Sequence, residues 1–220
     1  MAGHFCDMIY INLMNHFLKA MFNKFEEEAT TMRKNVLLTG LILASTLFLT
    51  GCGTISTLGK VEDGAAEEAG KMWDRWIEGQ GDIAVATTWE RKVKAGVSPE
   101  DIEIILQQVA TERNMKNVGV LPLSKELEAR SGKKEKHLTV YSFCSPSTAR
   151  DMVDFSPHMA AYLPCRISVV EKEDGLWLYT LNMDMMVRMG RKLPSPLKEK
   201  AWAVRDALYE MMERASKGEI

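Results

Sequence analysis

The sequence predicts an α+β fold, a mostly antiparallel sheet with helices packed on one face in a single compact domain. One observation behind this is a hairpin signal, since Asp174-Gly175 lies between strand-like segments 166–171 and 176–182. A second is a final helix that opens at Pro196 and carries an apolar stripe at helical spacing. The third is the predicted order of elements: helix, strand, helix, strand, strand, short helices, hairpin, helix.

The first two elements follow from apolar periodicity. A helix is predicted over 65–78, where apolar residues recur at spacings near three and four. Gly79 and the residues after it end this helix. The alternation of Ile83 and Val85 with their neighbours then predicts a strand over 82–94.

The middle of the chain supplies the next elements. Ser98 is a suitable N-cap and Pro99 suits the first helical position, so a helix is predicted from there to about residue 114. Strands are predicted over 117–123 and 137–143 from their apolar alternation. Two further segments are predicted as short helices: 147–154 and 157–161.

The N-terminal part resembles a bacterial lipoprotein signal. Met32-Arg33-Lys34 supplies the charged start, an apolar run follows, and the segment ends in Leu49-Thr50-Gly51-Cys52. This ending resembles the lipobox, after which the cysteine is lipidated and becomes the first mature residue. The resemblance therefore predicts lipidation of Cys52 and a location in the cell envelope, facing the periplasm. Gly53 favours the outer membrane over the inner one.

Five segments are predicted along the chain. Residues 1–31 carry an acidic run that a signal peptide does not contain, so we expect translation to start at Met32. The segments are 1–31, an N-terminal over-extension; 32–51, the signal peptide; 52–64, a linker; 65–82, a helix leading into the domain; and 83–220, the α+β domain.

The composition and charge of the chain indicate which kinds of molecule it binds. The chain has 220 residues, of which 46% are hydrophobic and 26% charged, as in globular proteins. Its formal net charge is −2, whereas a duplex-binding protein shows a basic excess or a basic face. We therefore expect no nucleic acid partner, and the membrane is the partner that the lipid on Cys52 implies.

Two short motifs resemble a known family. Phe143-Cys144-Ser145-Pro146 and Leu163-Pro164-Cys165-Arg166, with the spacing between them, resemble the bacterial domain of unknown function 302. Ser145 stands where that family usually has Asn. The resemblance covers roughly 83–215 and implies a compact α+β domain that is often a homodimer. It implies no activity.

Cys144 and Cys165 leave three interpretations open. An oxidising periplasm allows a disulfide, whose closed loop of about 21 residues would stabilise the fold by about 3 kcal/mol. The pair could instead be ligands or a redox couple, or two buried free thiols. A pocket close to them is compatible with all three interpretations. Four aromatic residues are candidates for its wall, with core packing as the alternative: Tyr141, Phe143, Tyr162 and Trp177.

His158 and a methionine cluster are the remaining candidates for a metal or cofactor site. Met183, Met185 and Met186 lie in a segment with four methionines in seven residues. Thioethers are soft ligands that suit Cu(I), and they also serve as axial ligands of haem. The alternative for the methionines is core packing, and for His158 a surface position near a helix start.

The function that these observations favour is non-catalytic. The chain has no Gly-x-Ser-x-Gly, P-loop, dinucleotide-binding glycine or His-Glu-x-x-His motif. We expect a lipid-anchored envelope protein that binds a small ligand, a metal or a redox group, with copper or haem as candidate cofactors. One alternative is a thiol-dependent enzyme or redox carrier in sulfur compound metabolism. The other is a structural or dimerising module with a Cys144–Cys165 disulfide.

Overall fold

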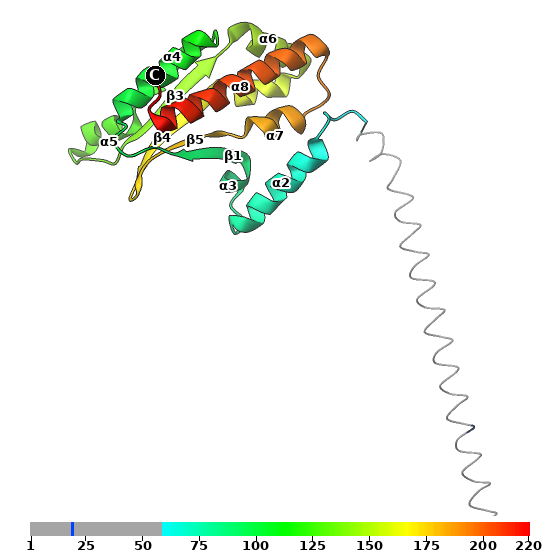
Figure 1. The fold of residues 1–220 in the computed structure, drawn as a ribbon, viewed down its shortest axis with the longest axis horizontal. Coiled ribbons are helices and arrows are strands. Elements are labelled where there is room, and N and C mark those ends of the chain that lie inside the picture. Colours follow the sequence, from blue (N-terminus) through cyan, green and yellow to red (C-terminus); the bar gives the residue numbers. More distant parts are fainter. Residues whose placement is uncertain (1–18, 20–58) are drawn as a thin grey trace, which may run out of the picture. The chain divides into compact units, whose positions relative to one another are not determined.

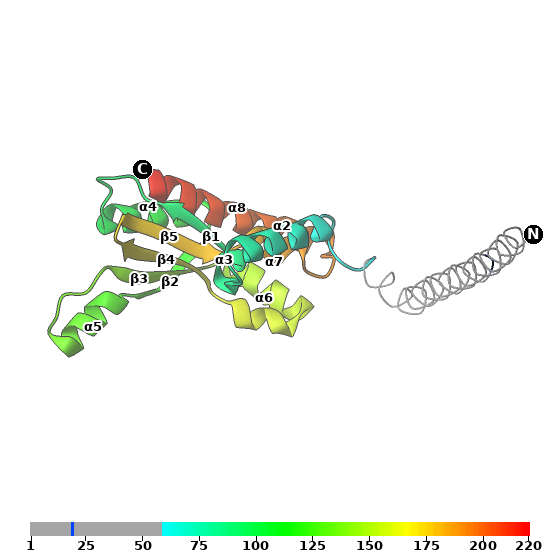
Figure 2. The ribbon, with the colours of Figure 1, turned by 90° about the horizontal axis from the view of Figure 1, so that it is seen from below.

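The computed structural model describes Lys19 and residues 59–220, and Lys60–Ile220 form one compact unit. A five-stranded antiparallel sheet with the strand order β1-β5-β4-β3-β2 is its centre (Figures 1 and 2). The strands are β1 (Thr88–Lys92), β2 (Lys116–Leu121), β3 (Leu138–Cys144), β4 (Cys165–Lys172) and β5 (Gly175–Leu181). The predicted α+β fold is confirmed.

Helices of very different length connect and cover these strands. The two longest elements that cover the sheet are α4 (Pro99–Glu112) and α8 (Ser195–Lys217), which lie together on one face (Figure 2). The others are α2 (Ala65–Glu78), α3 (Ile83–Thr87), α5 (Leu123–Ser131), α6 (Pro146–Phe155), the 3-10 helix η1 (Pro157–Tyr162) and α7 (Met183–Arg188).

The core lies between the sheet and the pair α4 and α8. Strand β3 alternates strictly, with Thr139, Tyr141 and Phe143 buried and the residues between them half-buried. Their side chains meet a cluster contributed by both helices and by the neighbouring strands, which includes Ile105, Leu106, Val109, Ile167, Leu178, Leu208 and Met211. Helices α4 and α8 thereby cover one face of the sheet, and they leave the other face uncovered.

Local signals explain where α4 begins. Ser98 accepts a hydrogen bond from the Asp101 N–H at 3.1 Å, and the Asp101 carboxylate accepts one from the Ser98 N–H at 2.9 Å. This is the reciprocal capping box, which satisfies two N–H groups that have no partner within the helix. The predicted start of the helix at Pro99 is confirmed.

The segment after α2 differs from its prediction. Residues 83–87 form the short helix α3, and the strand begins only at Thr88. The Asp82 side chain accepts a hydrogen bond from the Ala84 N–H at 2.8 Å, which caps the helix. The strand prediction for 83–87 was therefore wrong, because the apolar alternation there places Ile83 and Val85 on an exposed surface and not in a sheet.

The last residues of the predicted linker belong to the folded unit. Val61 forms a β-bridge with Arg191, and the Glu62 N–H donates to the Gly190 carbonyl at 3.1 Å. The Glu62 side chain is buried and forms an ion pair with Lys198 of α8. The predictions for 1–31 and for the signal peptide, with Cys52 and most of the linker, concern residues outside the described part of the chain.

Membrane spans can be assessed only for the part of the chain that the structure describes. None of the helices there combines the length and the apolar character needed to cross a bilayer.

Candidate functional site

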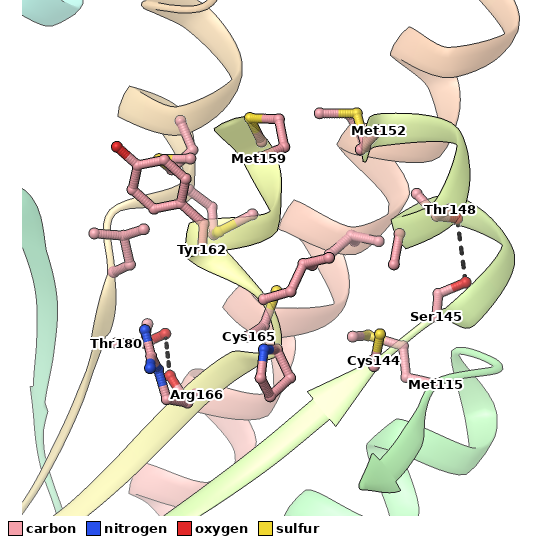
Figure 3. Close-up of a pocket in the computed structure, with 18 of the residues that line it drawn as sticks. Met115, Cys144, Ser145, Thr148, Met152, Met159, Tyr162, Cys165, Arg166 and Thr180 are labelled. Carbon is pink, nitrogen blue, oxygen red and sulfur yellow. Dashed lines mark hydrogen bonds between the residues drawn. The ribbon is translucent and has the colours of Figure 1, made fainter. Parts of the chain in front are cut away.

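A pocket of about 370 Å³ lies where β3 and β4 meet the short helices (Figure 3). Its wall includes residues of α6, η1, α7 and α8 as well as of the strands. Half-buried Val140, Ser168 and Tyr179 are register neighbours on β3, β4 and β5 and form part of its floor. They belong to the face of the sheet that α4 and α8 leave uncovered.

The turn from β3 into α6 forms one side of the pocket. Cys144 ends the strand, Ser145 precedes the helix and Pro146 occupies its first position. The hydroxyl groups of Ser145 and Thr148 share a hydrogen bond at 3.1 Å, which Figure 3 shows at the pocket edge. This bond fixes the first turn of α6, and Met152 further along the helix lines the pocket.

The turn from η1 into β4 forms the opposite side. Tyr162, Leu163 and Pro164 line the pocket and lead directly into Cys165 and Arg166. The Thr180 hydroxyl donates a hydrogen bond of 2.6 Å to the Arg166 carbonyl, which ties this end of β4 to β5. The two motifs that the sequence analysis singled out therefore form facing walls of one pocket.

Helix α7 closes the third side. The Asn182 side chain caps it by accepting a hydrogen bond from the Met185 N–H at 3.1 Å. Asp184 forms a two-bond ion pair with Arg205 of α8, at 2.8 and 3.1 Å. These contacts hold α7 against α8 and direct Met183 and Met186 into the pocket wall.

Many of the side chains that line the pocket contain sulfur. Among the described residues around the pocket, seven side chains carry sulfur: Met115, Cys144, Met152, Met159, Cys165, Met183 and Met186. Figure 3 shows several of them surrounding the same space. Thioethers are polarisable and conformationally adaptable, so such a wall can adjust to the shape of an apolar molecule.

The two cysteines are free thiols in the structure. Cys165 pairs with Phe143 in the β3–β4 ladder, so Cys144 is offset from it by one position. The two cysteines are therefore not direct partners in the ladder, although both line the pocket. The structure does not contain the disulfide that the sequence analysis kept as one alternative.

Both thiols are held in the protonated form. Burial raises the pKa of Cys144. Burial, and then the neighbouring Cys144, raise the pKa of Cys165 to about 11, although the positive charge of Arg166 acts against them. The thiolate is the reactive form of cysteine, so neither residue is activated as a nucleophile.

Of the remaining residues predicted to bind a metal or cofactor, some line the pocket and others do not. Met183 and Met186 line the pocket, whereas Met185 and the exposed His158 do not. Across residues 59–220, no three His, Cys, Asp or Glu side chains are grouped so that they could hold a metal ion. The structure therefore does not bring Cys144, Cys165 and His158 together as a metal-binding set.

The structure divides the four aromatic candidates between the pocket wall and other positions. Tyr162 lines the pocket, but Tyr141 and Phe143 are buried in the core on the other face of the sheet. The Tyr141 hydroxyl donates to Glu103 at 3.2 Å, and burial raises the pKa of this tyrosine. Trp177 lies near the hairpin, with the Lys172 ammonium over its ring.

Sequence reasoning missed Met115, Met152 and Arg166 as pocket residues. Met115 follows α4 and reaches the site only through the β2–β3 pairing, which no local pattern reveals. Arg166 could have been predicted as a pocket residue, because it ends the Leu-Pro-Cys-Arg motif directly after Cys165.

Fold and site together define an α+β domain with an open antiparallel sheet and a sulfur-lined pocket at one end of that sheet. The chain belongs to the family described as "Domain of unknown function DUF302", whose model matches residues 89–215. The family resemblance found in the sequence is confirmed.

Two relatives show the range of similarity. An uncharacterized protein of Aquifex aeolicus (strain VF5) is 27% identical over 112 residues, which cover 50% of this chain and 72% of that protein. A crystal structure of an uncharacterized conserved DUF302 protein from Bacillus stearothermophilus is 16% identical, with a TM-score of 0.48. That similarity covers 59% of this chain and 98% of the other.

Proposed function

We propose that this protein is a lipid-anchored protein of the bacterial cell envelope whose domain binds a small, mostly apolar ligand. The observation that carries the proposal is the pocket of about 370 Å³ at the sheet end. Its volume lies in the range of small-molecule sites, and its wall has their usual character, apolar with a few polar groups.

The chemistry of the lining favours binding over catalysis. None of the described residues that line the pocket is a His, Asp or Glu. These are the residues that most often serve as general acids and bases and that activate a thiol. Because burial also raises the pKa of both cysteine thiols, the alternative of a thiol-dependent enzyme has no support at this site.

The anchoring part of the proposal rests on the lipobox at Leu49–Cys52. Lys60 is already fixed to the folded unit, because its carbonyl accepts a hydrogen bond from the Lys192 N–H at 2.8 Å. Eight residues, 52–59, then separate the lipid from the domain, and fully extended they span at most about 28 Å. A domain on so short a tether stays close to the bilayer surface.

The surface of α2 and α3 supports contact with that bilayer. Trp73, Ile77 and Ile83 are 59%, 56% and 62% exposed, although such large apolar side chains are normally covered. Trp73 also packs on Trp76, with ring centroids 5.1 Å apart. Tryptophan favours the membrane–water interface, and Trp73 lies only about 12 Å along the helix from Ala65.

Ligand binding is tested with N-phenyl-naphthylamine, a neutral apolar dye that fluoresces when it leaves water. The full chain is expected to bind it, and Ser168→Trp should abolish the signal because this residue lies on the pocket floor. Val170→Trp is the matched control, since Val170 lies two residues further along β4 and does not line the pocket. Equal dye fluorescence in the two variants would contradict the proposal.

Anchoring is tested by cell fractionation and mass spectrometry. The native protein should sediment with membranes, and its N-terminal peptide should begin at Cys52 and carry acyl chains. Cys52→Ser should abolish the acylation. An unmodified Cys52 in the membrane fraction of the native protein would refute the lipid anchor.

A further inference from the structure

Arg166 is the only charged residue among those described residues that line the pocket. It is exposed, and its side chain lies at the edge of the pocket beside Thr180 (Figure 3). Most of the other lining residues are apolar. A single positive charge at the edge of an apolar pocket gives the site two chemically different ends.

The guanidinium of Arg166 is unpaired within the part of the chain that the structure describes. No salt bridge or side-chain hydrogen bond there involves it, whereas other arginines of the domain donate to carboxylates. These paired arginines are Arg91, Arg113, Arg150, Arg205 and Arg214. Arg166 differs from them in having five N–H donors available to a ligand.

The backbone that carries Arg166 is fixed on both sides. Its register partner on β3 is Ser142, and its carbonyl accepts the hydrogen bond from the Thr180 hydroxyl at 2.6 Å. The cation therefore projects from a hydrogen-bonded strand and not from a loop. Binding a ligand there requires ordering of one side chain only, which limits the entropic cost.

A second donor lies on the same side of β4. Ser168 is two residues from Arg166, so both side chains leave the same face of the strand. Ser168 also lines the pocket, and within residues 59–220 its hydroxyl makes no hydrogen bond. An anionic group at this position could accept hydrogen bonds from both residues.

We propose that the ligand of this pocket is a small amphipathic organic acid, with its carboxylate on Arg166 and its apolar body among the methionines. This inference rests on the proposed function, because it names the ligand class of the same site. The planar guanidinium matches a carboxylate in a bidentate arrangement. The same positive charge repels a metal cation, so it also argues against copper in this pocket.

The test compares two probes of equal chain length, octanoate and octyl alcohol, as competitors of N-phenyl-naphthylamine. The full chain with Cys52→Ser is used so that no attached lipid competes, and the signal that Ser168→Trp removes defines the pocket. Octanoate should displace the dye at an about ten-fold lower concentration than the alcohol, the effect expected of one charge-assisted hydrogen bond.

Variants of Arg166 test whether this residue causes the preference for octanoate over octyl alcohol. Arg166→Gln should remove the preference for octanoate and leave displacement by octyl alcohol unchanged, while Arg166→Lys should retain part of it. Arg130→Gln removes the same charge from an exposed position on α5, outside the pocket, and should leave the preference intact. Thermal melting checks that each variant is folded.

The outcomes separate this inference from the proposed function. If the dye binds and the two probes displace it equally, the acid specificity is wrong and the apolar pocket stands. If the dye does not bind, both proposals fail. If phosphatidylglycerol vesicles displace the dye and octanoate does not, the anion is a lipid headgroup and the free acid is refuted.

Discussion

Cys144 and Cys165 lie one register position apart on neighbouring strands, and they are free thiols although both line the same pocket. The direct partner of Cys165 is Phe143, which is buried in the core, whereas Cys144 follows the half-buried positions Val140 and Ser142. A disulfide needs its two Cβ atoms about 3.5–4.5 Å apart and directed toward one another. Cys144 is not the register partner of Cys165, so the β3–β4 ladder does not pair the two residues directly.

We therefore predict that both thiols are free in the native protein. Denaturation in the presence of an alkylating reagent, without reductant, should modify Cys144 and Cys165, and prior reduction should not increase the modification. Peptide mapping by mass spectrometry distinguishes these sites from Cys52. Peptides of Cys144 and Cys165 that are joined until reductant is added would show instead that the ends of β3 and β4 rearrange in the cell.

Replacing a core methionine should cost more unfolding free energy than replacing a methionine of the pocket wall. Met211 is fully buried between α8 and the sheet, so Met211→Ala leaves a cavity and should cost about 2–5 kcal/mol of unfolding free energy. Met159 borders a pocket that is already open, so Met159→Ala should cost less than about 1 kcal/mol. Urea denaturation measures both. Similar losses for the two variants would mean that the pocket is a closed part of the core.

The framework of the fold could be predicted because its signals are local. Asp174-Gly175 marked the β4–β5 hairpin, Ser98 and Pro99 marked the start of α4, and the structure has both. Helix α5 was missed, since residues 123–131 are mostly polar and exposed and offer no apolar stripe. Helix α3 was taken for a strand, because five residues do not distinguish the two periodicities.

The site was less predictable because it is assembled from distant segments. The two cysteine motifs indicated its position, but the register between β3 and β4 decides which side chains face the pocket. In the observed register, Tyr141 and Phe143 lie in the core, and Ser168 lines the pocket. Met115 reaches this space from the connection between α4 and β2, and Met152 from α6, so only tertiary packing brings them together.

Glu62 should stabilise the fold although it lies in the segment predicted as linker. Burial disfavours its charged form, but the hydrogen bonds from Lys198 and from the Asp63 and Leu193 N–H groups outweigh burial and lower the pKa of Glu62. Glu62→Gln should therefore cost about 1–3 kcal/mol of unfolding free energy at neutral pH. Asp63→Asn is the control, since this neighbouring carboxylate is exposed and should cost almost nothing.

The effect of Glu62 should also depend on pH. A carboxyl whose pKa is lower in the folded state contributes stability above its unfolded value of 4.5, and that contribution is lost as the pH falls through the folded value. Native protein and Glu62→Gln should therefore differ in stability at pH 7 and converge in acid. A difference that is independent of pH would assign the loss to packing and not to the charge.

Trp73 should lie at the bilayer surface when the protein is anchored. It is 59% exposed on α2, and Ile77 of the same helix and Ile83 of α3 are also exposed. In vesicles with brominated acyl chains, part of the tryptophan fluorescence of the lipidated protein should be quenched, and Trp73→Phe should remove that part. Trp177→Phe is the control, because Trp177 lies near the β4–β5 hairpin beneath Lys172. If quenching is unchanged in Trp73→Phe, the patch faces something other than lipid, and the exposed apolar side chains of α2 and α3 would then be a surface for a protein partner.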